Sequence, residues 1–453
     1  MPVTFTLGEL VARAGGVLSA VDAQRAIGPL TVDSREVEPG MLFCALPGRN
    51  EHGRHHASAA VERGAAAVLL DPPAAVGLPC WVHEDPLEAM AEVGRMHLKA
   101  VGARVVGVTG SVGKTSVKVL TAAVLQGRYR CAATPRNFNT QIGLPLALSA
   151  LEPGLEWFVA EMAMRAPGEI RALTAIAPPD VAVITNIGPA HLSELGSFEA
   201  ILEAKAEILE RLGPNDTAVL NGDDVRLRTL ADRVAGRVRW YGQEDADMCI
   251  RGVRSEPGFL AVELEDGGGR ETLTIPWDGA YQAYNIAAAA LVGRTLGLNW
   301  DEVRRGLATV RADAGHFRRL QVGSLTILDD TYNASPASMQ GGLMVLAGES
   351  GRRVALLGDM MELGPITEEA HREAGRQAAQ AADRILAVGS HSVWLAEEAR
   401  RAGARVEWVA DATAAERWCR TELRAGDHVY VKASRAVELD KLVSRLREWG
   451  GPS

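Results

Sequence analysis

The sequence lacks the features that mark exported, membrane-spanning and disulfide-stabilised proteins. Its 453 residues include only five cysteines, which are far apart and form no C-x-x-C pair, so neither a disulfide framework nor a zinc site is indicated. No stretch of about 18 apolar residues occurs, and the N-terminus MPVTFTLGEL has no basic segment followed by an apolar one. We therefore expect a cytoplasmic protein.

Long blocks of like charge are absent as well. The 48 Lys and Arg residues are outnumbered by 57 Asp and Glu residues, and the formal net charge of −9 is spread along the chain. This distribution offers no basic footprint for DNA or RNA. With 47% hydrophobic and 23% charged residues, the composition is that of a globular protein and excludes disorder and coiled coil. We expect a monomer that binds neither nucleic acid nor a membrane.

Lysine is scarce, since only six of the 48 basic residues are lysines. Where arginine is used almost everywhere, a lysine is favoured at positions that need an amine and not only a positive charge. For Lys99, Lys118 and Lys441, chance survival explains the residue equally well. The full set is Lys99, Lys114, Lys118, Lys205, Lys432 and Lys441.

The length predicts about three domains at roughly 150 residues each. Short apolar runs and helix-like stretches in residues 1–100 indicate a small α/β domain. Strand-like and helix-like segments alternate in residues 101–312, which favours a mostly parallel sheet with hairpins attached near 240–270. Residues 311–317, RADAGHF, resemble a linker, and residues 313–453 repeat the α/β rhythm expected of a doubly wound sheet.

A glycine-containing turn lies between the strand-like Arg104–Val108 and the helix-like Ser116–Gln126. Backbone N–H groups in such a loop face an anion at a helix N-terminus, a lysine reaches the outer phosphates, and a threonine can hold Mg²⁺. The strict motif needs glycine where this chain has Val108, so a structural turn is the alternative to ATP binding. The loop comprises Thr109, Gly110, Ser111, Val112, Gly113, Lys114, Thr115 and Ser116.

Glu161 ends the strand-like run WFVAE, and His191 follows the later run VAVITN. The carboxyl ends of parallel strands share one edge of the sheet, so both side chains are expected to face the phosphate loop. A carboxylate is a good Mg²⁺ ligand, whereas a histidine needs phosphate oxygens and waters to complete the shell. Taken alone, His191 also fits a hydrogen-bonded loop residue.

Lys205 lies on the apolar stripe of a helix expected over residues 198–210, with Ile201, Leu202, Ile208 and Leu209. Its side chain therefore points inward. One interpretation is a packed stem whose ammonium reaches water. The other is an amine whose pKa is lowered by burial or by nearby positive charge, and which is therefore reactive.

Several motifs together resemble a known family. TGSVGKTS is followed in order by NFNTQIGLP at residues 137–145, Glu161-Met162, ITNIGPAHL and AKAEI. In this order and spacing they resemble the ATP-dependent Mur ligases of bacterial cell-wall synthesis, and the resemblance covers the whole chain. LDDTYNASP at 328–336 and LGDMMELG at 357–364 resemble the branch that joins D-alanyl-D-alanine to UDP-N-acetylmuramoyl-tripeptide. The Asp-Asn-Pro-Arg run of the diaminopimelate-adding or lysine-adding relatives is absent.

The resemblance implies an α/β fold of three domains: an N-terminal UDP-substrate domain, a central phosphate-loop ATPase domain and a C-terminal Rossmann-like domain. It implies amide formation through an acyl phosphate with ATP and Mg²⁺, which yields a peptidoglycan precursor needed for cell shape and division. Lys114, Glu161, His191 and a carbamylated Lys205 are the implied catalytic residues, and Thr115, Glu161, His191 and Lys205 the metal ligands. Gln282, Asn285 and Asp330 would contact the nucleotide, and Ser34, Arg35, Gly48, Asn137, Asn139, Asn333, Lys432 and Arg435 the other substrates.

The sequence departs from the family's pattern at three places. The family's Asp-Gly-His is His52-Gly53-Arg54 here, and its His-Asn is Tyr281-Gln282, in which Gln282 keeps an amide able to pair with adenine. The usual Gly-Arg before the third domain is Gly315-His316. Whether His316, Arg318 or Arg319 supplies the nucleotide-contacting cation is left open.

A second hypothesis is another ligase of the family, either diaminopimelate-adding or lysine-adding, or similar to folylpolyglutamate synthase. A folylpolyglutamate-synthase-like ligase shares the phosphate loop and the lysine, but Asp33-Ser34-Arg35 and the run FCALPG within a full N-terminal domain speak against it. An ATP-hydrolysing switch that joins nothing is the third possibility. Analysis of the reaction products separates the three.

Overall fold

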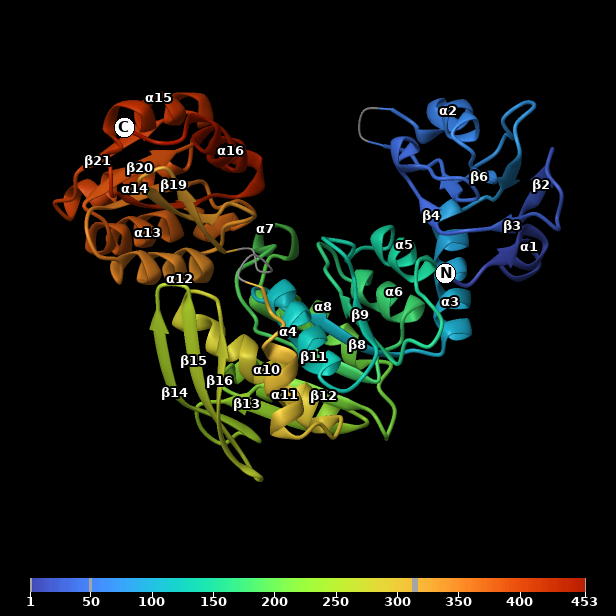
Figure 1. The fold of residues 1–453 in the computed structure, drawn as a ribbon, viewed down its shortest axis with the longest axis horizontal. Coiled ribbons are helices and arrows are strands. Elements are labelled where there is room, and N and C mark those ends of the chain that lie inside the picture. The colour runs from blue at the N-terminus through green and yellow to red at the C-terminus, as the bar shows by residue number, and fades with distance from the viewer. Residues whose placement is uncertain (1, 49–50, 312–316, 453) are drawn as a thin grey trace.

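The N-terminal sheet and its helices form the first of three α/β domains, drawn in blue in Figure 1. The computed structural model describes residues 2–48, 51–311 and 317–452. The sheet has the order β2-β7-β6-β5-β4, in which β4 to β7 run parallel and β2 pairs antiparallel. Its strands are β2 (Val17–Ser19), β4 (Leu30–Thr31), β5 (Leu42–Cys44), β6 (Ala67–Leu70) and β7 (Cys80–Val82).

Smaller elements complete this domain. β1 (Phe5–Thr6) pairs with β3 (Ala26–Ile27), and α1 (Leu7–Ala14) and α2 (Ala57–Glu62) accompany the sheet. The helix α3 (Pro86–Val101) starts at an Asp85 cap with proline in its first turn, as helix N-termini favour. It packs Met90 and Val93 into the N-terminal core and Leu98 into the central core. The expected boundary near residue 100 thus lies at the end of a helix shared by both domains.

The central sheet positions the site. Within the described residues its order is β16-β15-β14-β13-β12-β11-β8-β10-β9, with parallel pairing from β9 to β14 and antiparallel hairpins from β14 to β16. The hairpins expected near 240–270 are confirmed. The strands are β8 (Arg104–Thr109), β9 (Cys131–Ala133), β10 (Trp157–Glu161), β11 (Val181–Ile184), β12 (Thr217–Asn221), β13 (Arg237–Gly242), β14 (Met248–Glu256), β15 (Phe259–Asp266) and β16 (Gly269–Ile275).

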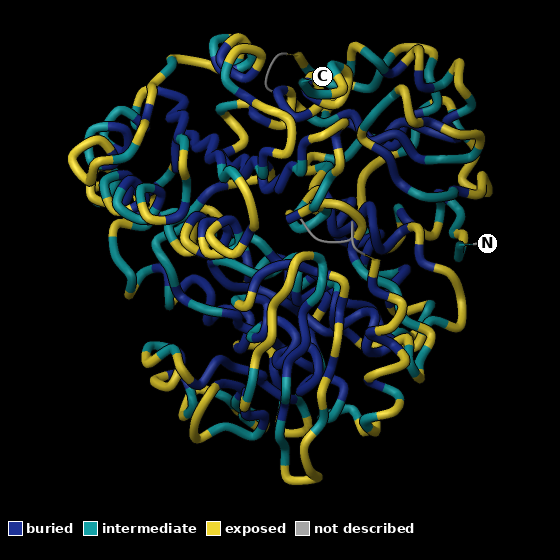
Figure 2. The backbone as a smooth tube through the Cα atoms, turned by 60° about the vertical axis from the view of Figure 1, so that its left-hand side comes forward, coloured by how far each residue is buried: buried dark blue, intermediate teal, exposed yellow. Residues whose placement is uncertain are grey.

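Helices cover both faces of this sheet, because its parallel strands are apolar on both sides. One core includes residues of α4 (Lys114–Gln126), α10 (Ala283–Thr295) and α11 (Trp300–Leu307). The other includes residues of α5 (Gly143–Ser149), α6 (Glu169–Ile176) and α8 (Phe198–Ala206). Figure 2 shows dark blue, buried backbone in the interior, surrounded by teal and yellow segments.

The C-terminal domain is doubly wound. Its sheet order, in the part of the chain that is described, is β17-β18-β22-β19-β20-β21, parallel except for β17 at one edge. The strands are β17 (Arg318–Val322), β18 (Leu325–Asp330), β19 (Arg353–Gly358), β20 (Arg384–Val388), β21 (Val406–Val409) and β22 (His428–Lys432). One face carries α12 (Pro336–Ala347), α13 (Thr367–Ala381) and α14 (Ser392–Arg401), and the other α15 (Ala412–Glu422) and α16 (Leu439–Trp449).

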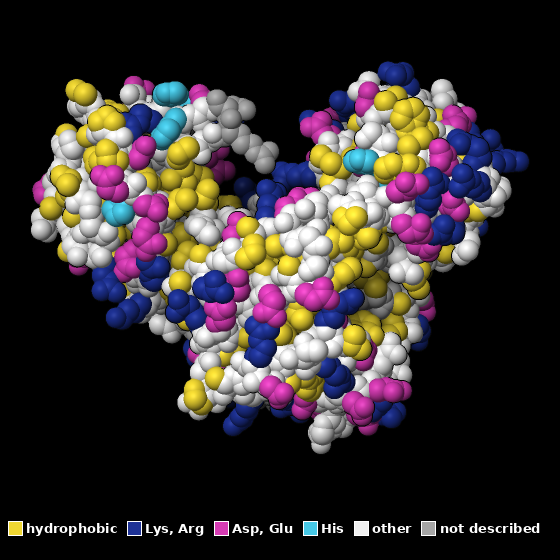
Figure 3. Space-filling model, turned by 180° about the vertical axis from the view of Figure 1, so that it is seen from behind, with side chains coloured by type: hydrophobic (Ala, Val, Ile, Leu, Met, Phe, Trp, Pro, Cys, Tyr) yellow, Lys and Arg dark blue, Asp and Glu magenta, His cyan; other side chains and the backbone are white. Residues whose placement is uncertain are grey.

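The N-terminal and C-terminal domains stand on the same side of the central domain, with a hollow between them in the space-filling view (Figure 3). The expected linker and the boundary at 312–313 fall mostly on residues 312–316, outside the described residues. None of the described helices is both long enough and apolar enough to cross a membrane.

Candidate active site

The phosphate loop lies between β8 and α4, and α4 begins at Lys114, two residues earlier than the sequence suggests. Gly110 has φ 143° and Gly113 has φ 89°. A Cβ on Gly110 would lie 1.9 Å from Thr185 Oγ1, and one on Gly113 would lie 2.6 Å from Asn285 Oδ1. Only glycine therefore fits these two positions, and Asn285 lies beside the loop.

Residues after β11 hold this loop in shape. Asn186 Oδ1 accepts from Val112 N at 3.0 Å, and its Nδ2 donates to Val112 O at 3.0 Å. Thr185 Oγ1 also donates to Val112 O, at 2.6 Å, and Ser111 Oγ accepts from Gly188 N at 2.8 Å. Thr185 and Asn186 were not predicted as functional, although they lie in the quoted run ITNIGPAHL. Their contacts join the ends of two neighbouring parallel strands.

Glu161 ends β10 and is 3% exposed. Its Oε2 accepts from Thr115 Oγ1 at 2.9 Å, and its Oε1 accepts from Asn139 Nδ2 at 2.9 Å. Lys118 Nζ lies 3.3 Å from Oε2 and donates to Arg136 O at 3.0 Å. Thr115 and Glu161, both predicted as metal ligands, thus lie within hydrogen-bond distance of each other.

The charge state of Glu161 follows from these neighbours. Burial raises the pKa of this carboxyl, but Lys118, Lys114 and two hydrogen bonds outweigh burial and hold the pKa below its usual value. Glu161 is therefore an ionised carboxylate beside a threonine hydroxyl, and these are oxygen groups of the kind that suits Mg²⁺. Lys118, which the sequence could not distinguish from a chance survivor, is 4% exposed and belongs to this cluster.

Lys205 is 2% exposed on α8, so the interpretation in which its ammonium reaches water is wrong. The helix ends at Ala206 and continues as a 3₁₀ turn (Glu207–Leu209), shorter than expected. Burial and the positive charge of Lys114 both lower the pKa of Lys205 well below its ordinary value. The amine is therefore buried beside the phosphate loop, within electrostatic range of a second lysine.

His191 lies beyond β11 at the start of α7 (Leu192–Leu195), with φ 65°. Burial lowers the pKa of its imidazole, Glu362 opposes that change, and the charges of Lys114 and Lys205 add to it. Lys114 therefore lies within electrostatic range of Glu161, His191 and Lys205. The structure brings the four predicted catalytic residues together.

Lys114 itself donates from Nζ to Gly110 O at 2.7 Å and to Ser111 O at 3.3 Å. The lysine thus lies over its own loop, at the edge where the strands end. The glycine cradle, the ionised Glu161 beside Thr115 and the buried Lys205 amine are three observations that fit a nucleotide phosphate chain and a divalent cation.

A second cluster stands at the ends of β18 and β22 in the C-terminal domain. Lys432 is 1% exposed, and its Nζ donates to Asp330 Oδ2 at 2.6 Å and to Asn333 O at 2.7 Å. Tyr430 Oη donates to the same Asp330 oxygen at 3.2 Å. Burial raises the pKa of Asp330, although Lys432 acts in the opposite direction. In this structure Lys432 thus holds the turn between Asp330 and Asn333.

Two tyrosines join this cluster to the central domain. Burial raises the pKa of Tyr332, and the charge of Glu161 raises it further, while the exposed Arg435 lowers it. Tyr281 is close enough to Asp330 for that charge to raise its own pKa, after burial as the larger cause. Tyr332 and Tyr281 were not predicted as site residues.

The remaining predicted contacts are placed as follows. Gln282 Oε1 accepts from Asn285 Nδ2 at 2.6 Å, which keeps the two predicted adenine-side amides together. The side chain of Asn137 is exposed, and its carbonyl accepts from Asn139 N at 2.8 Å. The nucleotide and substrate roles of these residues stay predictions.

The predicted uridine-diphosphate residues lie on the N-terminal domain. Arg35 is largely exposed and binds Asp33 through two hydrogen bonds of 2.9 and 2.6 Å, which lower the pKa of Asp33 to about 2. Ser34 begins the short 3₁₀ turn that contains Arg35. Gly48 is exposed and donates its N–H to Glu51 O at 3.0 Å. These residues are on a different domain from the phosphate loop.

Comparison with known proteins assigns the chain to a family. Models described as "Mur ligase family, catalytic domain", "Mur ligase middle domain" and "Mur ligase, glutamate ligase domain" match residues 27–109, 108–293 and 317–435. The chain belongs to the Mur ligase family. Each of the three domains of this Mur ligase therefore has a counterpart in the family.

Relatives match this Mur ligase along its length. A protein of Mycobacterium leprae (strain TN) named UDP-N-acetylmuramoyl-tripeptide–D-alanyl-D-alanine ligase is 33% identical and covers 98% of each chain. The crystal structure of MurF from Acinetobacter baumannii is 26% identical, covers 99% of each chain and superposes with a TM-score of 0.90. MurF from Thermotoga maritima, solved in complex with ADP, is 31% identical, covers 93% of this chain and 98% of its own, and has a TM-score of 0.82.

Three arginines near the departures from the family's pattern are tied to acidic residues of this Mur ligase. Arg54 replaces the family's histidine and donates to the carboxylate and carbonyl of Asp71 at 2.8 and 2.5 Å. Arg319 donates to Asp278 at 2.6 Å and to Glu349 at 2.5 Å, so it links the central and C-terminal domains. Arg318 pairs with Asp329 at 2.5 Å. Gly315 and His316 lie outside the described residues.

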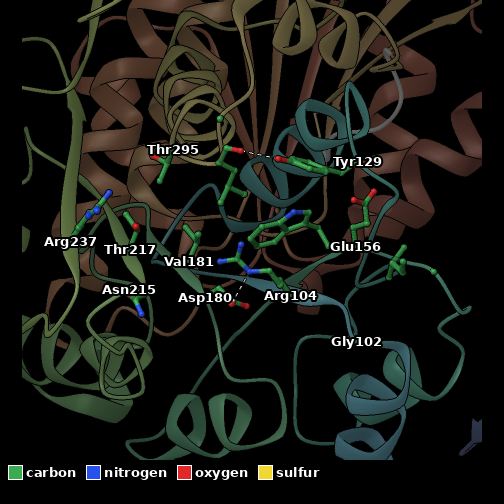
Figure 4. A pocket seen from close by; sticks show the side chains of 15 residues that line it. Gly102, Arg104, Tyr129, Glu156, Asp180, Val181, Asn215, Thr217, Arg237 and Thr295 are labelled. Carbon is green, nitrogen blue, oxygen red and sulfur yellow. Dashed lines mark hydrogen bonds and ion pairs between the residues drawn. The ribbon is translucent and has the colours of Figure 1, made fainter.

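A cavity of about 760 Å³ opens far from the phosphate loop of this Mur ligase. It lies at the opposite edge of the central sheet, where β8, β10, β11, β12 and β13 begin (Figure 4). Arg104 stacks on Trp157 there, with 4.4 Å from its guanidinium carbon to the ring centre, and pairs with Asp180 at 2.9 Å. We assign the active site to the phosphate-loop edge, because ligands of open α/β sheets bind at strand carboxyl ends.

Proposed function

We propose that this Mur ligase joins D-alanyl-D-alanine to UDP-N-acetylmuramoyl-tripeptide at the cost of ATP. The observation that carries the proposal is the cluster of Lys114, Glu161, His191 and Lys205 at one sheet edge, with Tyr332 of the C-terminal domain in electrostatic range of Glu161. The family membership and full-length relatives of that name support it. The product is the UDP-muramoyl-pentapeptide, a peptidoglycan precursor required for cell wall, cell shape and division.

The reaction has two balanced steps. An oxygen of the tripeptide's terminal carboxylate attacks the γ-phosphorus of ATP, the bond from that phosphorus to the bridging oxygen breaks, and ADP leaves. The amine of D-alanyl-D-alanine then attacks the acyl carbon of the acyl phosphate, the C–N bond forms, and inorganic phosphate leaves while the nitrogen releases a proton. Both reactants of the first step are anions, so catalysis is mainly electrostatic.

The chain's own residues supply that electrostatic stabilisation. Loop N–H groups and Lys114 bind the β- and γ-phosphates, and Thr115 with Glu161 would hold one Mg²⁺. His191 and a modified Lys205 would hold a second. Bound Mg²⁺ neutralises the charge that the phosphate and carboxylate oxygens share. Asn139 orients the Glu161 carboxylate through its 2.9 Å hydrogen bond.

Lys205 becomes a metal ligand by carbamylation. In its free-base form the amine attacks CO₂, the N–C bond forms, one proton leaves, and the side chain then ends in a carboxylate. The lowered pKa of Lys205 supports this step, because only the free amine reacts. A bare ammonium at that place would repel the cation it has to bind.

The three domains divide the substrates among them. The N-terminal domain would bind the uridine diphosphate through Ser34, Arg35 and the backbone near Gly48. The central domain would bind ATP, with Gln282 and Asn285 on the adenine side and Asn137 and Asn139 near the tripeptide. The C-terminal domain would contribute Asp330 to the ribose and Asn333, Lys432 and Arg435 to the dipeptide side. The protein would work as a monomer in the cytoplasm, where these nucleotide substrates are made.

Product analysis with the purified protein tests this function. With ATP, Mg²⁺, UDP-N-acetylmuramoyl-tripeptide and D-alanyl-D-alanine, we expect the UDP-linked pentapeptide, ADP and phosphate in equal amounts. Omission of any substrate should stop product formation. Addition of diaminopimelate, lysine or glutamate to an acceptor would support another ligase of the family, and ATP hydrolysis alone would support a switch.

A further inference from the structure

A carboxylate from the C-terminal domain reaches the predicted metal-binding histidine of the central domain. Glu362 lies in the turn between β19 and the 3₁₀ segment Gly364–Ile366. Its Oε2 is 2.7 Å from Nδ1 of His191. The two groups are close but do not form a hydrogen bond, because Nδ1 is one of the buried polar atoms of the described residues that have no hydrogen-bond partner.

The backbone around this contact is docked as well. Glu362 O accepts from Ser193 N, the second residue after His191, at 3.3 Å. A Cβ on Gly364 would lie 3.0 Å from Ser193 Cα, so the two chains approach closely. His191 and Glu362 have φ of 65° and 63°, a left-handed conformation that few residues other than glycine adopt. Two such residues face each other across the domain boundary, which indicates a built contact.

The turn that carries Glu362 is fixed from within its own domain. Met361 N donates to Ser434 Oγ at 2.9 Å, and Met360 N donates to His371 Nε2 at 3.0 Å. Met360 and His371 are fully buried. The position of Glu362 therefore follows the position of the whole C-terminal domain.

We propose that Glu362 is a positioning residue for His191. Histidines that bind metals almost always have the second ring nitrogen held by a carboxylate or a carbonyl, which sets the tautomer and the ring orientation. With Nδ1 held by Glu362, Nε2 is the nitrogen left to bind a cation at the phosphate loop. The inference rests on the proposed role of His191. It adds that the metal site is complete only when the C-terminal domain is docked on α7.

Glu194 provides a matched control. Its carboxylate lies within 4.8 Å of the ligand atoms of both His191 and Glu362, but it belongs to α7 of the central domain. If the local negative charge were all that mattered, loss of Glu194 and loss of Glu362 would have the same effect. If the carboxylate from the other domain orients the ring, only loss of Glu362 will matter.

The experiment compares Glu362→Ala, Glu362→Gln and Glu194→Ala with the wild type. Electron paramagnetic resonance would measure Mn²⁺ binding in the presence of a non-hydrolysable ATP analogue, and steady-state assays would separate kcat from KM. For Glu362→Ala we expect about a 10- to 100-fold loss in Mn²⁺ affinity and in kcat, with little change in KM for the UDP-substrate. Glu362→Gln keeps an oxygen that accepts from Nδ1–H and should recover most of the loss. Glu194→Ala should resemble the wild type.

Two results would overturn the proposal: Mn²⁺ affinity and kcat of Glu362→Ala within about twofold of the wild type, or an equal loss in Glu194→Ala. Thermal unfolding of each variant identifies one that fails to fold, and Glu362→Gln keeps the test valid in that case. A wild-type protein that forms no pentapeptide would instead refute the proposed function, while Mn²⁺ binding would still report on Glu362.

Discussion

At the scale of single residues, four of the six lysines lie in the phosphate-loop cluster or in the Asp330 cluster. Lys118, Lys205 and Lys432 are 4%, 2% and 1% exposed, and Lys114 lies in the phosphate loop. Lys99 and Lys441 are exposed, as expected of residues kept by chance. An arginine could not replace the buried lysines, because its guanidinium is larger and stays charged at every relevant pH. The buried positions of Lys118, Lys205 and Lys432 therefore suit a lysine better than an arginine.

The first prediction concerns the amine of Lys205. Lys205→Arg keeps a positive charge but cannot form the carbamate, and Lys205→Ala has no amine, so both variants should lose about 100-fold or more in kcat. Short carboxylic acids such as acetate should partly restore Lys205→Ala by occupying the vacated carboxylate position, and should leave Lys205→Arg inactive. Steady-state rates with increasing acetate measure this. Full activity of Lys205→Arg would refute the carbamate.

The second prediction concerns the buried pair of Lys118 and Glu161. Lys118→Met removes one partner and leaves a buried carboxylate with less compensation, so the free energy of unfolding should fall by about 3 kcal/mol. Urea denaturation measures the loss. The exposed Lys441, 2.7 Å from Glu438, is the matched control, and Lys441→Met should cost less than about 1 kcal/mol. Equal losses in the two variants would show that burial of the pair contributes nothing.

At the scale of helices and strands, apolar periodicity predicted much of the fold. Buried parallel strands such as β8, β10 and β19 are short apolar runs, and both faces of the sheets are covered, as that pattern implies. The edge strand β17 was missed because its sequence, RRLQV, is polar and half-exposed. β9 and β12 were missed as well. β9 consists of only three small residues, and β12 lies next to a charged turn, so both give weak signals.

The candidate site was also predicted only in part. Glu161 ends a strand, His191 follows one, and both belong to motifs. The order of the strands was therefore enough to place them at one sheet edge. Lys118, Tyr332 and Glu362 could not, because their roles depend on contacts between segments far apart in the chain. Tertiary distances of this kind have no local sequence signal.

The third prediction concerns the conformation of the phosphate loop. Gly113→Ala forces a side chain into a left-handed position and against Asn285 Oδ1, so KM for ATP should rise about tenfold or more. Gly102 ends α3 at φ 73° with open space around it, so Gly102→Ala has the backbone strain without the contact. That control should lose about 1 kcal/mol of stability and keep its KM for ATP. A normal KM in Gly113→Ala would refute the cradle.

At the scale of the whole molecule, the domains are joined by different kinds of contact. The N-terminal domain is attached by the shared helix α3 and by Leu30 N, which donates to Ser149 Oγ of α5 at 3.0 Å. The C-terminal domain is held by polar contacts, among them Arg319 with Asp278 and Glu362 with His191. Polar contacts between domains break and re-form more readily than a packed apolar core, so the C-terminal domain is the part expected to move.

The fourth prediction follows from the separation of the sites. Lys114→Ala should lower kcat by about 100- to 1000-fold and leave the affinity for the UDP-substrate unchanged, because that site is on another domain. Arg35→Ala should do the reverse and raise KM for the UDP-substrate about tenfold, with a modest change in KM for ATP. Calorimetry with the UDP-substrate and steady-state kinetics measure both. If Lys114→Ala lost its UDP-substrate affinity, the sites would not be separate.

The most direct test of the proposed reaction follows one oxygen atom. UDP-N-acetylmuramoyl-tripeptide with oxygen-18 in its terminal carboxylate is mixed with the enzyme, unlabelled ATP, Mg²⁺ and D-alanyl-D-alanine, and the phosphate is examined by mass spectrometry. If the carboxylate attacks the γ-phosphorus, each phosphate released with a pentapeptide carries one oxygen-18, and the new amide keeps the other. Unlabelled phosphate released with pentapeptide would contradict the acyl phosphate, and phosphate released without pentapeptide would contradict the ligase function itself.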